Sequence, residues 1–210
     1  MRRAVPWIVT AACFLAFAAS YLELQRVRQR FGEVTQRPYH DHQDVFVIKA
    51  ALADASQPIV VIGDSITEMA PLPAEIADHP VINAGIGGIS TSGYKLLAGR
   101  LFEGVQPYAV VIALGANDTG SSNLRADAKE LIAVIKALTP FVVVSTTATD
   151  QATSSHIREA AEASGVRFIE AEVPEALKRK DHIHFTAAAY RVWLPQIRSA
   201  VEAVLANPKS

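Results

Sequence analysis

The sequence predicts an α/β fold, a three-layer α/β/α flavodoxin-like sandwich built around a five-stranded parallel sheet. From residue 58 onward, short β-branched runs alternate with helical patterns, which is typical of a sheet covered on both faces. The runs are apolar throughout, as expected of strands whose two faces are both buried. A length of 210 residues, half of them hydrophobic, is enough for one sizeable core. We therefore expect a single domain over residues 58–206.

The expected strands are the apolar runs within that domain, and right-handed crossovers between them leave few possible strand orders. The order 2-1-3-4-5, numbered along the chain, is the one that we expect. In such a sheet, ligands bind beyond the carboxyl ends of the strands, between the first and third strands, where the order reverses. The five runs are residues 59–62, 81–82, 109–114, 141–144 and 166–169.

Residues 1–24 are expected to be a signal peptide or an uncleaved transmembrane anchor. Arg2 and Arg3 precede an uncharged stretch over residues 4–22, which would be roughly 28 Å long as a helix, close to the thickness of a bilayer core. A basic start and the Ala16-Phe17-Ala18 sequence also fit a cleaved secretory signal. The length of the run favours the anchor. With the N-terminus inside, the following domain would be periplasmic or extracellular.

Residues 25–57 are expected to form a juxtamembrane tether. A charged helical piece leads to a polar stretch around Pro38, and a second short helix follows near residues 44–55. The tether holds residue types that can ligate metals, but in a polar linker we expect them to be solvated and predict no metal site. They are His40, Asp41, His42 and Asp44.

The charge of the chain is unevenly distributed. Residues 1–37 contain six arginines and two glutamates, a charge of +4, so the rest of the chain carries −5 to give the net −1. A mildly acidic body argues against a nucleic-acid partner, which would require a basic patch. The basic end favours proximity to a membrane through the N-terminal helix. The oligomeric state does not follow from the sequence.

Polar residues and glycines follow three neighbouring strands. Asp64 and Ser65 come after the first strand, a glycine block that includes Gly88 after the second, and Asn117-Asp118 after the third. Each signal alone has an ordinary alternative. Gly-Asp-Ser is common turn chemistry, and the glycine block resembles a dinucleotide fingerprint but has Ser90 in place of the third glycine. Asn117 could simply cap the next helix.

The fourth signal lies just before the last helical pattern. Asp181 and His184, three residues apart on a turn, can place the carboxylate against Nδ1 of the imidazole and leave Nε2 free to accept a proton from a serine. A polar loop with incidental histidines is the alternative. Thr186 is expected to be the N-cap of the last helix, which would hold this loop in place. Together the four motifs favour a catalytic site more strongly than any one of them does alone, because all of them would lie at one crevice.

This set of motifs resembles the SGNH/GDSL hydrolase superfamily over about residues 58–206. The resemblance implies that Ser65 is the nucleophile, that His184 is its general base and that Asp181 orients the histidine. It also implies an oxyanion hole formed by the backbone N–H groups of Ser65 and Gly88 and by the side-chain amide of Asn117. Asp64 and Asp118 are expected to brace the site without reacting. No metal or organic cofactor is implied.

The resemblance predicts a serine esterase that works through an acyl-Ser65 intermediate. His182 stands where a small residue is usual and is a rival for the base, although the spacing selects His184. Ile66-Thr67-Glu68 resembles the acetylhydrolase and carbohydrate-esterase branches, so we expect an acetyl or other short-chain esterase acting on extracytoplasmic carbohydrate or small esters. The alternatives are an O-acyltransferase to a glycan hydroxyl, a lysophospholipase or thioesterase, and a non-catalytic glycan-binding protein.

Overall fold

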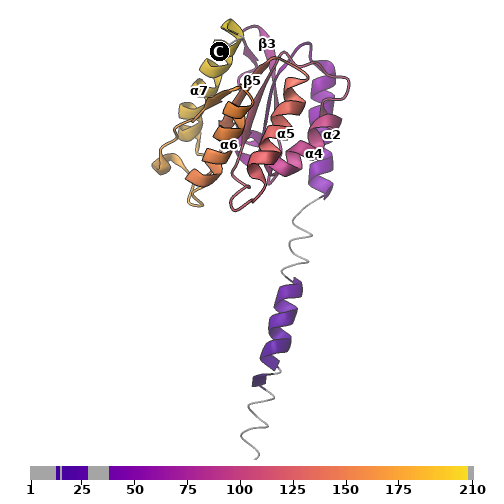
Figure 1. The fold of residues 1–210 in the computed structure, drawn as a ribbon, viewed down its shortest axis with the longest axis vertical. Coiled ribbons are helices and arrows are strands. Elements are labelled where there is room, and N and C mark those ends of the chain that lie inside the picture. The colour runs from indigo at the N-terminus through magenta and orange to yellow at the C-terminus, as the bar shows by residue number, and fades with distance from the viewer. Residues whose placement is uncertain (1–12, 15, 28–37, 208–210) are drawn as a thin grey trace, which may run out of the picture. The chain divides into compact units, whose positions relative to one another are not determined.

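The computed structural model of the chain describes residues 13–14, 16–27 and 38–207, with side chains from Asp44 onward in the last range. Two compact units are distinguished, Met1–Gln43 and Asp44–Ser210, and the second contains the whole sheet (Figure 1). In the first unit, residues 13–14 and 16–27 are helical. The described residues contain no helix that is both long and apolar enough to cross a membrane. Much of the predicted spanning segment, residues 4–12 and 15, lies outside the described residues.

The sheet of the second unit has six strands in the order β2-β3-β1-β4-β5-β6. Its five parallel members follow the predicted order 2-1-3-4-5, since β1 lies between β3 and β4. The parallel strands are β1 (Ile59–Gly63), β3 (His79–Gly85), β4 (Ala109–Leu114), β5 (Phe141–Thr146) and β6 (Arg167–Ile169).

The expectation of a five-stranded sheet was wrong by one strand. The sixth, β2 (Glu75–Ile76), pairs antiparallel with the start of β3, and Ile76 lies opposite His79. A two-residue strand is too short to give an alternating pattern. The turn between the strands has positive φ at both of its residues, Ala77 and Asp78, where Asn-Gly or Asp-Gly would be the recognisable hairpin sequence. The sequence therefore carried no hairpin signal at this edge of the sheet.

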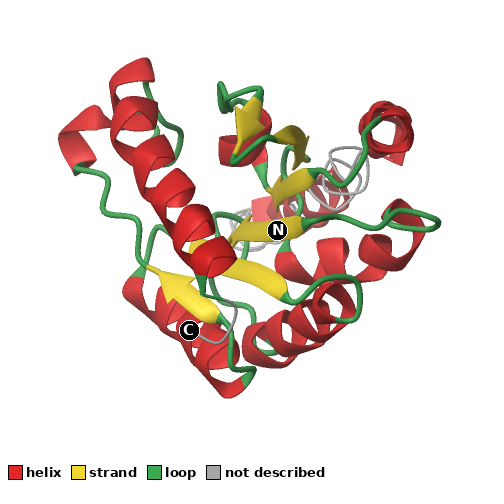
Figure 2. Ribbon diagram, turned by 90° about the horizontal axis from the view of Figure 1, so that it is seen from above, coloured by secondary structure: helices red, strands yellow, loops and turns green. Residues whose placement is uncertain are grey.

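Helices cover both faces of the sheet, as Figure 2 shows from above. One face packs against α4 (Thr91–Leu101), α5 (Leu124–Lys136) and α6 (Gln151–Ala163), and the other against α7 (Ala187–Ala206). Alternate residues of the central strands point to opposite faces. Val60 and Ile62 join the first core, whereas Ile59 and Val61 join the second, and all four are almost completely buried. The uniformly apolar strands thus build two cores that share one sheet.

The helix that precedes the sheet is α2 (Pro38–Asp54), and its second half belongs to the core. Val45, Ile48 and Leu52 are buried in the same core as α4 and α5, whereas Phe46 on the same helix is 74% exposed. The predicted tether over residues 25–57 therefore overlaps the compact unit, which begins at Asp44. The apolar spacing of three and four residues explains the difference, because it gives this helix a buried face.

We expect Leu52→Ala to lower the free energy of unfolding by about 2–5 kcal/mol, because a leucine that is 2% exposed leaves a cavity when truncated. Urea denaturation measures the loss. Phe46→Ala on the same helix is the matched control and should change stability by less than about 0.5 kcal/mol. Equal stability of the two variants would contradict the assignment of this helix to the core.

Candidate active site

Ser65 is the first residue of α3 (Ser65–Glu68), a short helix that starts directly after β1. Two glycines allow this helix to lie against the strand ends. A Cβ atom on Gly63 would lie 2.0 Å from Oγ1 of Thr67, and one on Gly85 would lie 2.1 Å from the backbone nitrogen of Glu68. Any larger residue at either position would push α3 away from the sheet. Close packing of backbone thus places Ser65 at the carboxyl ends of β1 and β3.

Asp64 is completely buried beside Ser65 and connects three strand ends. Its Oδ1 atom accepts a hydrogen bond from the backbone N–H of Ile66 at 3.0 Å, which caps α3. Its Oδ2 atom accepts from the Thr147 hydroxyl after β5 and from the backbone N–H of Ala116 after β4. Burial raises the pKa of Asp64, and the three hydrogen bonds oppose that rise. This carboxyl therefore holds the turn after β1 in place and, at 0% exposure, presents no oxygen to solvent.

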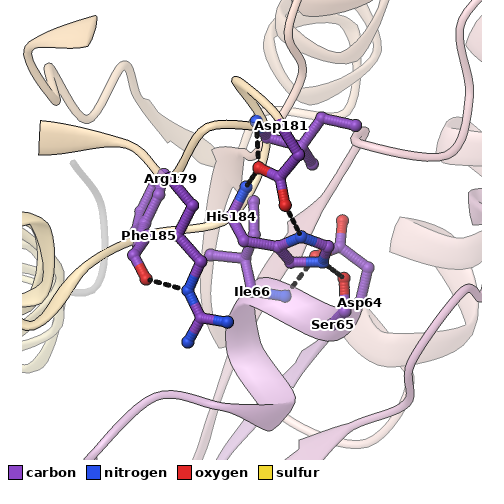
Figure 3. A network of polar contacts seen from close by, with 8 residues as sticks. Asp64, Ser65, Ile66, Arg179, Asp181, His184 and Phe185 are labelled. Carbon is purple, nitrogen blue, oxygen red and sulfur yellow. Dashed lines mark hydrogen bonds and ion pairs between the residues drawn. The ribbon is translucent and has the colours of Figure 1, made fainter. Parts of the chain in front are cut away.

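The structure brings Ser65, His184 and Asp181 into one line (Figure 3). Oγ of Ser65 lies 3.0 Å from Nε2 of His184, and Nδ1 of His184 lies 2.8 Å from Oδ2 of Asp181. Oδ1 of Asp181 accepts hydrogen bonds from the backbone N–H groups of Ile183 and His184. The hydrogen bond with His184, together with these backbone bonds, holds the pKa of Asp181 well below its usual range. An ionised carboxylate therefore faces Nδ1, which leaves Nε2 as the nitrogen beside the serine.

Backbone and cap hydrogen bonds close the loop that carries Asp181 and His184. Thr186 is the N-cap of α7, as predicted, because its hydroxyl accepts from the N–H of Ala189. The same hydroxyl donates to the carbonyl of Leu177 at 2.6 Å. Arg179 donates its backbone N–H to the carbonyl of His184 at 2.7 Å and its Nε–H to that of Phe185. Both ends of the loop are thus fixed at the start of α7.

His182 lies on the same loop but is turned away from the serine. Its Nδ1 atom lies 2.8 Å from Oε1 of Glu175, and its side chain is 77% exposed. The residue has a φ of 61°, in the left-handed region that favours glycine, which gives a physical reason for a small residue at this position. The structure therefore pairs His184, and not His182, with Ser65.

The two remaining members of the predicted oxyanion hole lie on adjoining loops. Gly88 is exposed and has a φ of 79°, and the following residue, Ile89, accepts a hydrogen bond from Nδ2 of Asn117 at 3.0 Å. An amide nitrogen has two hydrogens, so one can hold the loop while the other faces a ligand. The bond joins the loop after β3 to the loop after β4 and keeps Asn117 beside the glycine block.

Asp118, next to Asn117, connects these two loops through hydrogen bonds from Thr91. Its carboxylate is 3% exposed and accepts hydrogen bonds from the backbone N–H of Thr91 at 3.0 Å and from the Thr91 hydroxyl at 2.7 Å. Burial raises the pKa of Asp118, and the bonds from Thr91 oppose this. The carboxylate satisfies an N–H group at the start of α4 that the helix itself leaves unpaired. Asp118 therefore fixes where α4 begins relative to Asn117.

The sequence interpretation missed three residues that position the site. Thr147 bonds Asp64, Asn83 donates its side-chain amide to the carbonyl of Thr67 at 2.8 Å, and Tyr190 donates its hydroxyl to the carbonyl of Ile66 at 2.7 Å. The position of Thr147 directly after a strand was an available signal. Tyr190 lies on the buried face of α7, and a tyrosine among apolar residues at helical spacing gives no separate signal for its hydroxyl.

The side chains of His40, Asp41 and His42, which the sequence analysis considered as metal-ligand types, lie outside the described side chains. Among the residues that were described, no group of three or more His, Cys, Asp or Glu residues is arranged to hold a metal ion.

We expect Tyr190→Phe to lower the free energy of unfolding by about 1–3 kcal/mol, because it leaves the buried carbonyl of Ile66 without its donor. Burial raises the pKa of Tyr190 to about 12, so the hydroxyl is a donor throughout the neutral range. Tyr108→Phe is the control, since no partner of the Tyr108 hydroxyl is found in the described part of the chain. Equal unfolding midpoints for the two variants would show that the bond from α7 to α3 contributes nothing.

Comparison with known proteins agrees with this geometry. The profile of the GDSL-like lipase/acylhydrolase family matches residues 61–192, more than half of the chain. No match was found among curated proteins.

Solved structures share the fold. A GDSL-like lipase from Bacteroides thetaiotaomicron is 21% identical with a TM-score of 0.61, covering 79% of this chain and 98% of its own. A lipase/acylhydrolase from Enterococcus faecalis is 19% identical with a TM-score of 0.52, covering 74% and 100%. A variant of an acetyl xylan esterase from Geobacillus stearothermophilus is 14% identical with a TM-score of 0.56, covering 70% and 95%.

The family match covers the segment that supplies the serine, the glycine block, the asparagine and the histidine, and the resemblance to SGNH/GDSL hydrolases is confirmed. This chain belongs to the GDSL-like lipase/acylhydrolase family and is an ester-hydrolysing enzyme.

Proposed function

We propose that this enzyme is a short-chain acyl esterase, with acetyl as the preferred group, acting on extracytoplasmic carbohydrate or other small esters through an acyl-Ser65 intermediate. One observation carries the proposal. Oγ of Ser65 lies 3.0 Å from Nε2 of His184, whose opposite nitrogen is held by the ionised carboxylate of Asp181. A serine hydroxyl is a weak nucleophile, and this arrangement is the one that removes its proton as attack proceeds.

The reaction has two steps in this arrangement. Oγ of Ser65 attacks the carbonyl carbon of the ester while its proton passes to Nε2 of His184. The bond from the carbon to the alcohol oxygen then breaks, and the alcohol leaves with that proton. In the second step His184 removes a proton from water, which attacks the acyl-serine, and the carboxylic acid leaves as Ser65 regains its hydrogen. Asp181 stabilises the imidazolium that forms in each step.

The negative charge that develops on the carbonyl oxygen requires donors on the opposite side from His184. The N–H of Ser65 at the start of α3, the N–H of Gly88 and the remaining amide hydrogen of Asn117 are the proposed donors. Each such donor typically contributes about 100- to 1000-fold to the rate. Asp118 and Asp64 keep the loops of these donors in register without touching the substrate.

Two observations support a small acyl group carried by a carbohydrate. The segment Ile66-Thr67-Glu68 after the nucleophile resembles the acetylhydrolase and carbohydrate-esterase branches of the superfamily. A structure of similar fold is that of an acetyl xylan esterase, by its name an enzyme that removes acetyl groups from a polysaccharide. A chain-length series of p-nitrophenyl esters tests this choice. Activity that rises steadily toward long acyl chains would instead favour a lysophospholipase or thioesterase.

We expect Ser65→Ala to abolish ester hydrolysis and labelling by a fluorophosphonate probe while the unfolding midpoint stays unchanged. The reason is that the side chain of Ser65 contributes its hydroxyl to His184 alone in the described structure. Hydrolysis of p-nitrophenyl acetate, probe labelling and thermal unfolding provide the measurements. Full activity in this variant would contradict the nucleophile. Absence of labelling and turnover in the unaltered enzyme would favour the non-catalytic glycan-binding alternative.

We expect His184→Ala to reduce kcat by about 100- to 10,000-fold, the usual contribution of a general base. His182→Ala is the matched control on the same loop and should have a far smaller effect, because the ring of His182 contacts Glu175. The kcat values of the two variants for p-nitrophenyl acetate show which histidine is the general base. A larger loss in His182→Ala would move the base by two residues.

An O-acyltransferase would use the same three residues and pass the acyl group to a glycan hydroxyl in place of water. Products formed from an acetyl donor in the presence of a glycan acceptor separate these two functions. Free acetate as the main product supports hydrolysis, whereas an acetylated acceptor supports transfer.

We further propose that the catalytic unit lies outside the cytoplasm, tethered by an uncleaved N-terminal anchor; the alternative is secretion after cleavage of a signal peptide. The apolar run over residues 4–22 behind Arg2 and Arg3 supports this location. Alkaline phosphatase fused to the C-terminus should be active in a bacterial host, and a cytoplasm-dependent fluorescent fusion should be dark. The opposite pair of results would contradict the proposal, and the mass of the mature protein would reveal whether the segment is removed.

A further inference from the structure

An exposed carboxylate lies beside the nucleophile, on the side of the glycine block. Glu68 is the last residue of α3, three positions after Ser65. Residues three apart on a helix are neighbours on its surface, with about 5–6 Å between their Cβ atoms. The two residues between them, Ile66 and Thr67, are buried. Ser65 and Glu68 therefore share the accessible face of this short helix.

The backbone of Glu68 is held in place from several sides. Its N–H donates to the carbonyl of Asp64 at 2.9 Å, and its carbonyl accepts from Nδ2 of Asn83 at 3.3 Å. Gly85 packs directly against it, since a Cβ atom there would lie 2.1 Å from the Glu68 nitrogen. The side chain of Glu68 thus starts from a fixed point at the carboxyl end of β3.

The carboxylate of Glu68 lies over Gly87. A Cβ atom on Gly87 would be 2.8 Å from Oε2 of Glu68 and 3.5 Å from Oε1, so the carboxylate fills the space that a side chain at this position would need. Within the described chain, this carboxylate has no hydrogen-bond or ion-pair partner. An unpartnered negative charge is therefore placed against the glycine block.

The same turn carries the proposed oxyanion donor. Gly87 and Gly88 are its central residues, and a hydrogen bond from the N–H of Ile89 to the carbonyl of Ile86 closes it. The N–H of Gly88 has no partner in the described chain. Its nitrogen is two bonds from the Cα atom of Gly87, so standard bond lengths place Oε2 of Glu68 within roughly 7 Å of it. The charge of Glu68 thus lies close to where the carbonyl oxygen becomes negative.

We propose that Glu68 is a specificity-determining residue that favours esters with a positively charged group near the reacting carbonyl and disfavours anionic ones; this rests on the proposed esterase function. A carboxylate at this distance repels the oxyanion of an uncharged ester and lowers the rate of its hydrolysis. A cation on the substrate is attracted to the same carboxylate and offsets its charge. On a carbohydrate, such a cation would be the free amine of an amino sugar, whereas a phosphorylated alcohol would be repelled.

The kinetic test compares acetylcholine with 3,3-dimethylbutyl acetate, an uncharged ester of the same shape. Glu68→Gln should lower the ratio of their kcat/KM values about tenfold at low salt, because it removes a charge that acts over several ångströms. The same variant should hydrolyse the uncharged ester about threefold faster, since its oxyanion is no longer repelled. Glu68→Asp keeps the charge and should keep most of the preference. A purely structural role of Glu68 would change both esters in the same direction.

The matched control is Glu162→Gln, an exposed position on α6, which should leave the ratio unchanged. Added salt should reduce the preference of the unaltered enzyme, because salt screens exposed charges. An unchanged ratio in Glu68→Gln would overturn the proposal.

A binding test separates failure of this assignment from failure of the proposed esterase. Titration of the full-length Ser65→Ala protein with the two esters, followed by NMR, needs no turnover. Acetylcholine should bind about tenfold more tightly than the uncharged ester, and Glu68→Gln in that background should remove the difference. Hydrolysis by the unaltered enzyme without this binding preference would overturn the role of Glu68 alone. The binding preference without hydrolysis would overturn the esterase and leave Glu68 as part of a cation site.

Discussion

The buried carboxyl of Asp64 is the interaction on which the rest of the site depends. It lies at the point where β1 ends and accepts hydrogen bonds from the first turn of α3, from the backbone after β4 and from Thr147 after β5. A buried carboxyl is costly unless its oxygens are satisfied, and here the three donors come from three different strand ends. The same bonds that compensate its burial therefore fix Ser65 relative to the loops beside it.

The second half of the site is organised by one helix. The N-cap of α7 closes the loop of Asp181 and His184 through Thr186, and Tyr190 in the first turn of the same helix bonds the carbonyl of Ile66 next to the nucleophile. The base and the nucleophile are far apart in sequence, yet the segments that carry them both form hydrogen bonds with residues at the start of α7. These contacts with α7 explain how Oγ of Ser65 and Nε2 of His184, which are 119 residues apart in the sequence, come to lie 3.0 Å apart.

The two halves differ in how firmly they are held. The nucleophile side consists of buried groups, with Asp64 and Thr67 fully inaccessible and Thr147 nearly so. On the base side, the side chains of His184 and Asp181 are 30% and 45% exposed, and the loop is closed largely by backbone hydrogen bonds. Local opening costs least where few buried contacts are broken, so the base loop is the part most able to adjust around a bound substrate.

The sequence by itself determined the sheet and the chemistry at its edge. Uniformly apolar runs identified the five parallel strands, because a strand that is buried on both faces leaves a local pattern in the sequence. The predicted strand order then placed Asp64-Ser65, Gly88 and Asn117 after neighbouring strands. The three-residue spacing from Asp181 predicted His184 over His182, and the tertiary structure added the physical reason, which is the positive φ of His182 and its contact with Glu175. Only the tertiary structure revealed β2, the core position of α2 and the roles of the Thr147 and Tyr190 hydroxyls. Each of these arises from contacts between segments distant in sequence, which no local spacing records.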